Sequence, residues 1–283
     1  MRRNLNYLAG PTLHGRGSGT IDEYHAAQFI ARKLERYGLA PAADGGTYIQ
    51  AATVHSPKIS HTWNVLAKIE GTDEKDQIIL LSAHLDHLGV KNGQTYPGAD
   101  DDASGTVAVM ELGRALAKEP RPRRTIVFAL WGSEEAGLIG ARYFLQHPTF
   151  ELKQIIANLE FEMIGRPDPE VQRDQLWLTG WERTDLGPKL AAHGARLVGD
   201  PHADKNFFTR SDNYALAKDG IVAQTVSSYG LHGDYHRPTD TLAKIDWQHL
   251  DRAIASMIGP VTWLANSDFV PRWNEGQKPR EGD

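Results

Sequence analysis

The sequence predicts an α/β fold in three layers, α/β/α, around a central mixed, mostly parallel β-sheet. Short apolar runs typical of buried strands alternate along the chain with segments whose apolar residues recur at helical spacing. Such alternation favours a sheet covered by helices, and neither an internal repeat nor a long linker interrupts it. The predicted strands are 64–70, 77–84, 125–131, 155–163, 175–179 and 221–227, and the predicted helices are 103–118, 135–147, 184–194 and 246–265.

Each element has a local signal. The first two strands flank the turn Gly71-Thr72-Asp73, and the helix at 103–118 carries Val107, Met110, Leu112 and Leu116 at helical spacing. The run TIVFALW at 125–131 has the length and composition of a buried strand, and Pro148 closes the helix that follows it. The later strands and helices show the same two patterns.

Composition narrows the classes of function. A net charge of −5 over 283 residues gives no case for nucleic acid or an anionic membrane as a partner. The chain has no cysteine, which excludes disulfides and a thiol nucleophile, and no apolar stretch as long as a membrane span. We expect one domain over 1–283, with a helical segment at 1–50 packed on it and a loose polar tail at 270–283.

Acidic and histidine side chains gather where predicted strands end. In open α/β sheets ligands bind at the carboxyl ends of the strands, so we expect these clusters to converge there. The clusters are His84, Asp86 and His87; Asp100, Asp101 and Asp102; Glu134 and Glu135; Glu160 and Glu162; and His232, Asp234, His236 and Asp240.

Each cluster alone has an ordinary structural explanation. Three aspartates can form a turn or a helix N-cap, and two glutamates can begin a helix, where acids favour the positive end of the dipole. Together, however, so many acids behind apolar strands are most simply explained by a bound cation, because buried charge is costly without compensation. Imidazole and carboxylate donors without thiolate suit zinc, manganese or cobalt, and the set is large enough for two ions that share an aspartate.

Five motifs in this order resemble the co-catalytic dizinc aminopeptidases. The motifs are HLD at 84–86, PGADDDASG at 97–105, SEEAGLIGA at 133–141, EMIGRP at 162–167 and YHRPTDT at 235–241. The wider family includes glutaminyl cyclases, glutamate carboxypeptidase and the transferrin receptor ectodomain. The resemblance runs through nearly the whole chain and implies the zinc-peptidase (phosphorylase/hydrolase-like) fold and a peptide or aminoacyl substrate.

The resemblance implies a ligand set for two zinc ions per chain. His84 and Glu162 would hold one ion, and Glu135 and His236 the other. Asp100 would bridge the two ions.

The resemblance also implies catalytic roles. Glu134 would be the general base that takes a proton from the attacking water. Asp86 would accept a hydrogen bond from the first histidine ligand, and Asp240 would do the same near the second. Tyr235 would donate to the oxyanion of the tetrahedral intermediate.

The chain departs from the family pattern at a few positions. Many members have aspartate where Glu162 stands and histidine where Asn213 stands, which puts metal geometry and substrate specificity in question. A protease-associated domain, inserted in some relatives near 51–63, is absent here. The family also implies a cis peptide between Asp100 and Asp101.

Other functions stay open at this point. The same scaffold supports a glutaminyl cyclase-type acyltransferase, and Arg210 as a carboxylate binder would favour a carboxypeptidase or dipeptidase. A non-catalytic binding domain is disfavoured because capable residues fill every ligand position, and a serine hydrolase because no G-x-S-x-G motif is present. Relatives are mostly exported, so we expect a secreted or periplasmic protein whose signal has been removed, although a cytoplasmic location stays open. A monomer is favoured, but the sequence leaves the oligomeric state unknown.

Overall fold

The structure, a computed structural model, describes residues 1–280 and contains a mixed central sheet, as predicted. Its strands lie in the order β1-β3-β7-β4-β8-β11-β9-β10, with β2 paired to β3. The central strands β7, β4, β8 and β11 pair in parallel, whereas β3 is antiparallel to β7. The strands are β1 Ala40–Pro41, β2 Ile49–Thr53, β3 His61–Ile69, β4 Glu74–His84, β7 Arg124–Trp131, β8 Ile155–Phe161, β9 Leu176–Leu178, β10 Leu197–Gly199 and β11 Ala223–Ser227.

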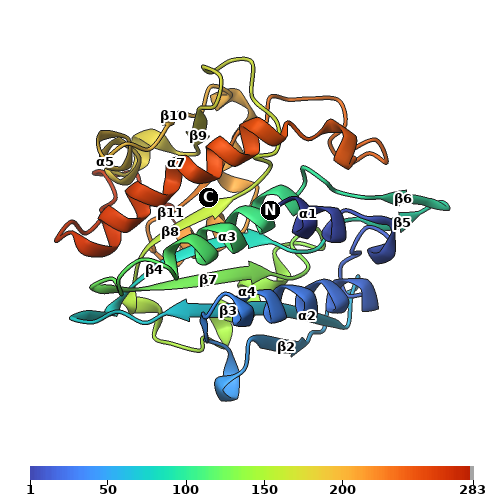
Figure 1. Ribbon diagram of the computed structural model, residues 1–283, viewed down its shortest axis with the longest axis horizontal. Helices are drawn as coiled ribbons and strands as arrows, with labels where there is room; N and C mark the ends of the chain where they lie inside the picture. Colours follow the sequence, from blue (N-terminus) through green and yellow to red (C-terminus); the bar gives the residue numbers. More distant parts are fainter. Residues whose placement is uncertain (281–283) are drawn as a thin grey trace.

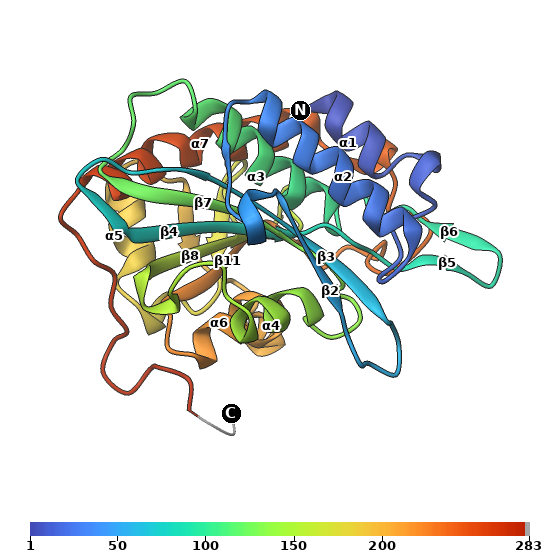
Figure 2. The same ribbon diagram turned by 90° about the horizontal axis from the view of Figure 1, so that it is seen from below.

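Helices cover both faces of this sheet and complete the three layers (Figures 1 and 2). Figure 2 shows α1, α2, α3 and α7 on one face and α4 and α6 on the other. A separate hairpin, β5 Gly89–Lys91 and β6 Gln94–Tyr96, projects from the end of the molecule near α2 (Figure 2). The helices are α1 Arg2–Leu8, α2 Ile21–Arg36, α3 Ala103–Leu116, α4 Ile139–Gln146, α5 Leu186–Ala192, α6 Asn213–Lys218 and α7 Trp247–Asn266.

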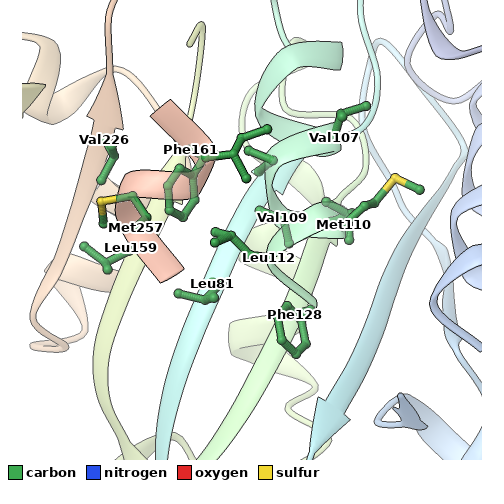
Figure 3. Packing of buried hydrophobic residues seen from close by; sticks show 14 of the residues in the cluster. Leu81, Val107, Val109, Met110, Leu112, Phe128, Leu159, Phe161, Val226 and Met257 are labelled. Carbon is green, nitrogen blue, oxygen red and sulfur yellow. The ribbon is translucent and has the colours of Figure 1, made fainter. Parts of the chain in front are cut away.

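The core lies on both sides of the central strands, which explains their apolar runs. All eight residues of β7 and the last seven of β4 are buried, as expected for parallel strands covered on both faces. Figure 3 shows Leu81 of β4 and Phe128 of β7 facing Leu112 of α3, with Met257 of α7 beside Leu159 of β8. This packing fixes the carboxyl ends of β4, β7 and β8.

Two differences from the predicted bounds affect residues of the candidate site. The helix predicted at 135–147 begins only at Ile139, because residues 132–138 form a loop at the end of β7. The strand predicted at 155–163 ends at Phe161, so Glu162 lies just beyond it. None of the helices within residues 1–280 is long and apolar enough to cross a membrane.

Arg16, which precedes α2, is fully buried and ties three parts of the chain together. Its guanidinium donates to the carbonyl oxygens of Leu8 at 2.7 Å, Leu85 at 2.9 Å, Pro97 at 2.7 Å and Gly98 at 3.0 Å. These carbonyls belong to the end of α1, the segment just after β4 and the loop before α3. One arginine therefore fixes the two loops that begin with HLD and PGADDD.

Glu23 of α2 holds the loop after β7 in place through its carboxylate. Its buried carboxylate accepts hydrogen bonds from the hydroxyl of Thr62 at 2.9 Å, from the backbone N–H of Gly19, and from the hydroxyl of Ser133 at 2.9 Å. Ser133 has a φ of 53°, an uncommon value for a residue other than glycine, and it directly precedes Glu134. The contact with Glu23 holds this strained turn in place.

We expect Arg16→Met to destabilise the protein by roughly 3–5 kcal/mol, because four buried carbonyls lose a charged donor. The control is Arg32→Met: Arg32 is exposed and, within residues 1–280, hydrogen-bonds only Gln28, at 3.4 Å, so its loss should cost no more than about 0.5 kcal/mol. Urea unfolding of both variants measures the difference. Equal stabilities for the two variants would show that the Arg16 contacts contribute little.

The tail predicted to be loose makes specific contacts in its described part, 270–280. The backbone N–H of Arg272 donates to Asp185, and the indole N–H of Trp273 donates to the carbonyl of Gly220 at 3.0 Å. The side chain of Asn274 donates to the carbonyl of Glu182 at 2.7 Å. Residues 281–283 lie outside the described residues.

Candidate metal centre

The predicted ligands come from the carboxyl ends of neighbouring strands. His84 is the last residue of β4, Glu162 follows β8, and Glu135 lies in the loop after β7. His236 lies in the long loop between β11 and α7. Because β7, β4, β8 and β11 run parallel, their carboxyl ends meet at one edge of the sheet, and the structure brings these four side chains together there.

One group of possible metal ligands contains His84, Asp101 and Glu162. One ligand atom of each lies within 4.8 Å of the others. His84 Nε2 is 3.2 Å from Asp101 Oδ1, and the His84 and Asp101 side chains are buried. This group combines one imidazole with two carboxylates.

A second group lies on the other side of the Asp101 carboxylate. It contains His87, Asp101 and Glu135, again with ligand atoms within 4.8 Å of one another. His236 approaches the same two acids, with Nε2 3.2 Å from Asp101 Oδ2 and 3.1 Å from Glu135 Oε1. The two oxygens of Asp101 therefore face different groups, which is the arrangement expected of a bridging carboxylate.

Asp100, the predicted bridge, belongs to neither group, and its neighbour occupies that position. The Asp100 carboxylate accepts hydrogen bonds from the backbone N–H of Gly165 at 2.8 Å and from the hydroxyl of Ser104 at 3.2 Å. Its other oxygen lies 2.9 Å from His232 Nε2. These partners turn Asp100 away from the two groups, and Asp101 belongs to both groups instead.

The peptide geometry shifts by one residue in the same way. The non-proline cis peptide joins Asp101 to Asp102, not Asp100 to Asp101 as predicted. Asp240, predicted to lie beside His236, instead accepts hydrogen bonds from the backbone N–H groups of Asp100 and Asp101 at 3.0 and 3.1 Å. Burial and the nearby Asp100 raise the pKa of Asp240 to about 6. Asp240 thus positions the acidic loop rather than a histidine.

Glu134 lies beside the two groups without belonging to either. Its backbone N–H donates to Asp86 Oδ1 at 2.9 Å, and that of Glu135 donates to Asp86 Oδ2 at 3.3 Å. His84 Nδ1 is 3.6 Å from Asp86 Oδ1, longer than a hydrogen bond. The Asp86 carboxylate therefore holds the backbone of Glu134 and Glu135 in place, and it also lies near His84.

The ligand atoms of the two groups fit a metal because they lack other partners. Within residues 1–280, buried atoms without a hydrogen-bond partner include both ring nitrogens of His84 and His87, Asp101 Oδ2 and Glu135 Oε1. Buried polar atoms are nearly always satisfied, so such a concentration needs an explanation. Imidazole nitrogens and carboxylate oxygens gathered within 4.8 Å of one another are the kinds of donor that zinc takes.

The pKa shifts of the acidic residues also favour a bound cation. Burial, reinforced by acidic neighbours, raises the pKa of Glu134 well above its usual range and also raises that of Glu162. Burial and Asp101 would raise the pKa of Glu135, but its contacts with His236 and His87 lower that pKa to about 2. Crowded carboxylates of this kind resist ionising together unless a cation is present.

A small pocket opens beside Glu162. The rings of Trp177, Phe207, Tyr229 and Tyr235 line it. Burial and the charge of Asp101 raise the pKa of Tyr235, so its hydroxyl keeps its proton and is able to donate it in a hydrogen bond. The pocket is thus lined by aromatic rings and lies next to a candidate metal ligand, Glu162.

One polar residue that lines this pocket, Arg210, comes from the segment TRSDN at 209–213. The guanidinium of Arg210 lies over the rings of Phe207 and Tyr235, at 5.0 and 5.9 Å from their centroids. Asn213 is buried, accepts from the hydroxyl of Thr225 at 2.9 Å and donates to the carbonyl of Phe208 at 3.1 Å. Asn213 therefore holds Thr225, a residue that lines the pocket, in place.

Asp101 and His87 belong to the clusters that the sequence places at this edge, but the predicted ligand set included neither. Asp101 is one of three consecutive acids, and the prediction took Asp100 from that motif. His87 directly follows HLD, and alternation along an extended chain would place it on the face opposite His84.

Comparison with known sequences finds relatives among peptidases. A probable zinc metalloprotease of Leptosphaeria maculans is 37% identical over 142 residues, which cover 47% of this chain and 32% of that protein. Leucine aminopeptidase 2 of Trichophyton rubrum is 29% identical over 212 residues, which cover 65% of this chain and 41% of that protein. The chain thus spans less than half the length of these curated relatives.

Comparison with solved structures confirms the fold. An aminopeptidase from Aneurinibacillus sp. strain AM-1 matches with a TM-score of 0.72 at 17% identity, covering 99% of this chain and 96% of that one. The glutaminyl cyclase of Porphyromonas gingivalis matches with a TM-score of 0.69 at 16% identity, covering 92% and 95%. At these identities the likeness shows the fold alone.

The family resemblance drawn from the motifs is confirmed by the sequence profile of peptidase family M28, which matches residues 64–259. That stretch holds both groups of candidate ligands and the two adjacent glutamates. The chain belongs to peptidase family M28.

Proposed function

We propose that this protein is an aminopeptidase that hydrolyses the N-terminal peptide bond of peptides with two zinc ions. The observation that carries the proposal is the Asp101 carboxylate, whose two oxygens face two separate imidazole–carboxylate groups. His84 and Glu162 would hold one ion, and Glu135 and His236 the other. The absence of thiolate in these groups, and the names of the relatives, favour zinc.

The chemistry divides between the ions and the chain. When bound, zinc ions supply Lewis acidity toward the scissile carbonyl and make a water acidic enough to attack near neutral pH. Glu134 lies in neither ligand group, and the protein backbone around it is fixed by Asp86. Its carboxylate takes the proton of the attacking water and passes it to the leaving amine. The hydroxyl of Tyr235 donates to the oxyanion.

The aromatic pocket would receive the side chain of the substrate's first residue. It adjoins Glu162, so a peptide whose scissile carbonyl lies between the two groups would place that side chain among Trp177, Phe207 and Tyr229. Apolar side chains gain most from burial there, and we therefore expect substrates with an apolar first residue.

Two alternatives use the same scaffold. A glutaminyl cyclase-type acyltransferase has a closely similar fold, so the fold does not choose between the reactions. A carboxypeptidase or dipeptidase would use Arg210, at the mouth of the pocket, to bind a substrate carboxylate. A secreted or periplasmic monomer remains part of our proposal.

We expect about two zinc ions per chain by elemental analysis, and hydrolysis of aminoacyl chromogenic substrates that stops on chelation and returns with zinc. Blocking the substrate's α-amino group should prevent hydrolysis, whereas blocking its C-terminus should not. One ion per chain together with cyclisation of N-terminal glutamine would favour the cyclase. A requirement for a free C-terminus would favour the carboxypeptidase or dipeptidase. Full activity in exhaustively demetallated protein would refute a metal-dependent mechanism.

A further inference from the structure

His87 occupies a position for which the proposed chemistry gives no role. Its side chain is completely buried, and neither ring nitrogen has a hydrogen-bond partner in the described part of the chain. The backbone is held on both sides, since its N–H donates to the carbonyl of Arg16 at 3.0 Å and its carbonyl accepts from Ser18 at 3.2 Å. Two unsatisfied ring nitrogens at a rigidly held buried residue are unusual.

The ring of His87 points at the second group of ligands. Nδ1 lies 2.8 Å from Glu135 Oε1 and 3.8 Å from Asp101 Oδ2. His236 Nε2 lies 3.1 Å and 3.2 Å from the same two oxygens. One ligand atom each of His87, Asp101 and Glu135 lie within 4.8 Å of one another, and His236 Nε2 lies beside the same two carboxylate oxygens.

The nitrogen–oxygen separations are compatible with ligands of one zinc ion. Zinc binds imidazole nitrogen and carboxylate oxygen at about 2.0–2.2 Å, which puts tetrahedral ligand atoms roughly 3.3–3.6 Å apart. The four nitrogen–oxygen separations, 2.8 to 3.8 Å, bracket that value. Gly98 keeps the space clear, because a Cβ at this position would collide with the ring of His87.

We propose that His87 is a fourth protein ligand, through Nδ1, of the ion held by Asp101, Glu135 and His236. This inference rests on the metal centre of the proposed function. It makes the two ions unequal: one has two imidazoles and two carboxylates from the protein, whereas the other has only His84, Asp101 and Glu162. Four protein ligands are typical of tightly held zinc, and three leave a position for water or substrate.

The competing explanation is that His87 only orients Glu135 by a hydrogen bond. Counting the imidazoles on each ion separates the two. Protein labelled with nitrogen-15 at histidine and loaded with cadmium-113 gives a cadmium signal that is split once by each coordinated imidazole nitrogen. We expect one cadmium signal split into a doublet, from His84, and one split into a triplet, from His87 and His236.

Two variants complete the experiment. In His87→Gln, which keeps a hydrogen-bond donor for Glu135, the triplet should collapse to a doublet. In chelator competition, the ion held by Asp101, Glu135 and His236 should bind this variant at least about 100-fold more weakly than it binds the unmodified protein. Loss of a residue that only orients a ligand costs at most about that factor. His232→Gln is the matched control, since His232 lies 2.9 Å from Asp100 and outside both groups, and it should keep the triplet.

Each outcome has a separate meaning. Two doublets in the unmodified protein would overturn the role of His87 and leave the two-ion proposal intact. Failure of the protein to bind cadmium or zinc, with activity retained, would overturn the proposed function itself. Circular dichroism of His87→Gln establishes that the variant is folded before its cadmium spectrum is compared.

Discussion

Replacing Glu134 with glutamine should leave both ions bound and lower turnover by roughly 10²–10⁴-fold, the range that general acid–base catalysis contributes. Glutamine keeps the shape of the side chain but takes up no proton from the attacking water. The loss corresponds to an increase of about 3–5 kcal/mol in the activation barrier. It should fall on kcat rather than on KM, because substrate contacts at the pocket are unchanged.

The comparison variant is Glu135→Ala, which removes a ligand instead of a base. Its Oε1 contacts both His87 and His236, so we expect this variant to lose metal as well as stability. Metal analysis and steady-state kinetics of the two variants separate the roles. Near-normal turnover in Glu134→Gln, or metal loss in that variant, would show that the pair has been assigned wrongly.

Replacing Asp101 with asparagine should weaken the binding of both ions and reduce hydrolysis to background. Both Asp101 oxygens face ligand groups, and a neutral amide does not supply two anionic donors. Zinc content after dialysis and activity at saturating zinc measure the effect.

Asp100→Asn is its matched control, one residue away and equally buried. Asparagine keeps an acceptor for Gly165 and Ser104, so this variant should retain both ions. If Asp100→Asn lost the metals and Asp101→Asn kept them, the bridge would lie where the motif alone placed it.

The sequence predicted the sheet because apolar runs such as 125–131 mark central strands, and the residues after such runs gather at one edge of a parallel sheet. His84 ends β4 and Glu162 directly follows β8, whereas Glu135 and His236 lie further along the loops after β7 and β11. The ligand roles of these residues were implied by the family resemblance and not by the strand pattern.

Positions in loops were harder to predict because tertiary contacts decide them. Which of three consecutive aspartates faces the two candidate ligand groups depends on the contacts that hold Asp100: Ser104 is near in sequence, but Gly165 and His232 are distant. Strand alternation would send His87 to the face opposite His84, but β4 ends at His84 and the chain then changes direction. No periodicity describes such a turn.

The contacts of Arg16 and Glu23 mean that sequence similarity and the cooperative folding unit have different boundaries. The family profile begins at residue 64, inside β3, whereas these two residues hold the loops before α3 and after β7. A fragment cut at residue 64 would leave the carbonyls of Leu85, Pro97 and Gly98 without their donor and would expose the apolar face of α3 that α2 covers. Fragment design and limited proteolysis of this protein should therefore treat the first sixty residues as part of the same unfolding unit as the catalytic loops.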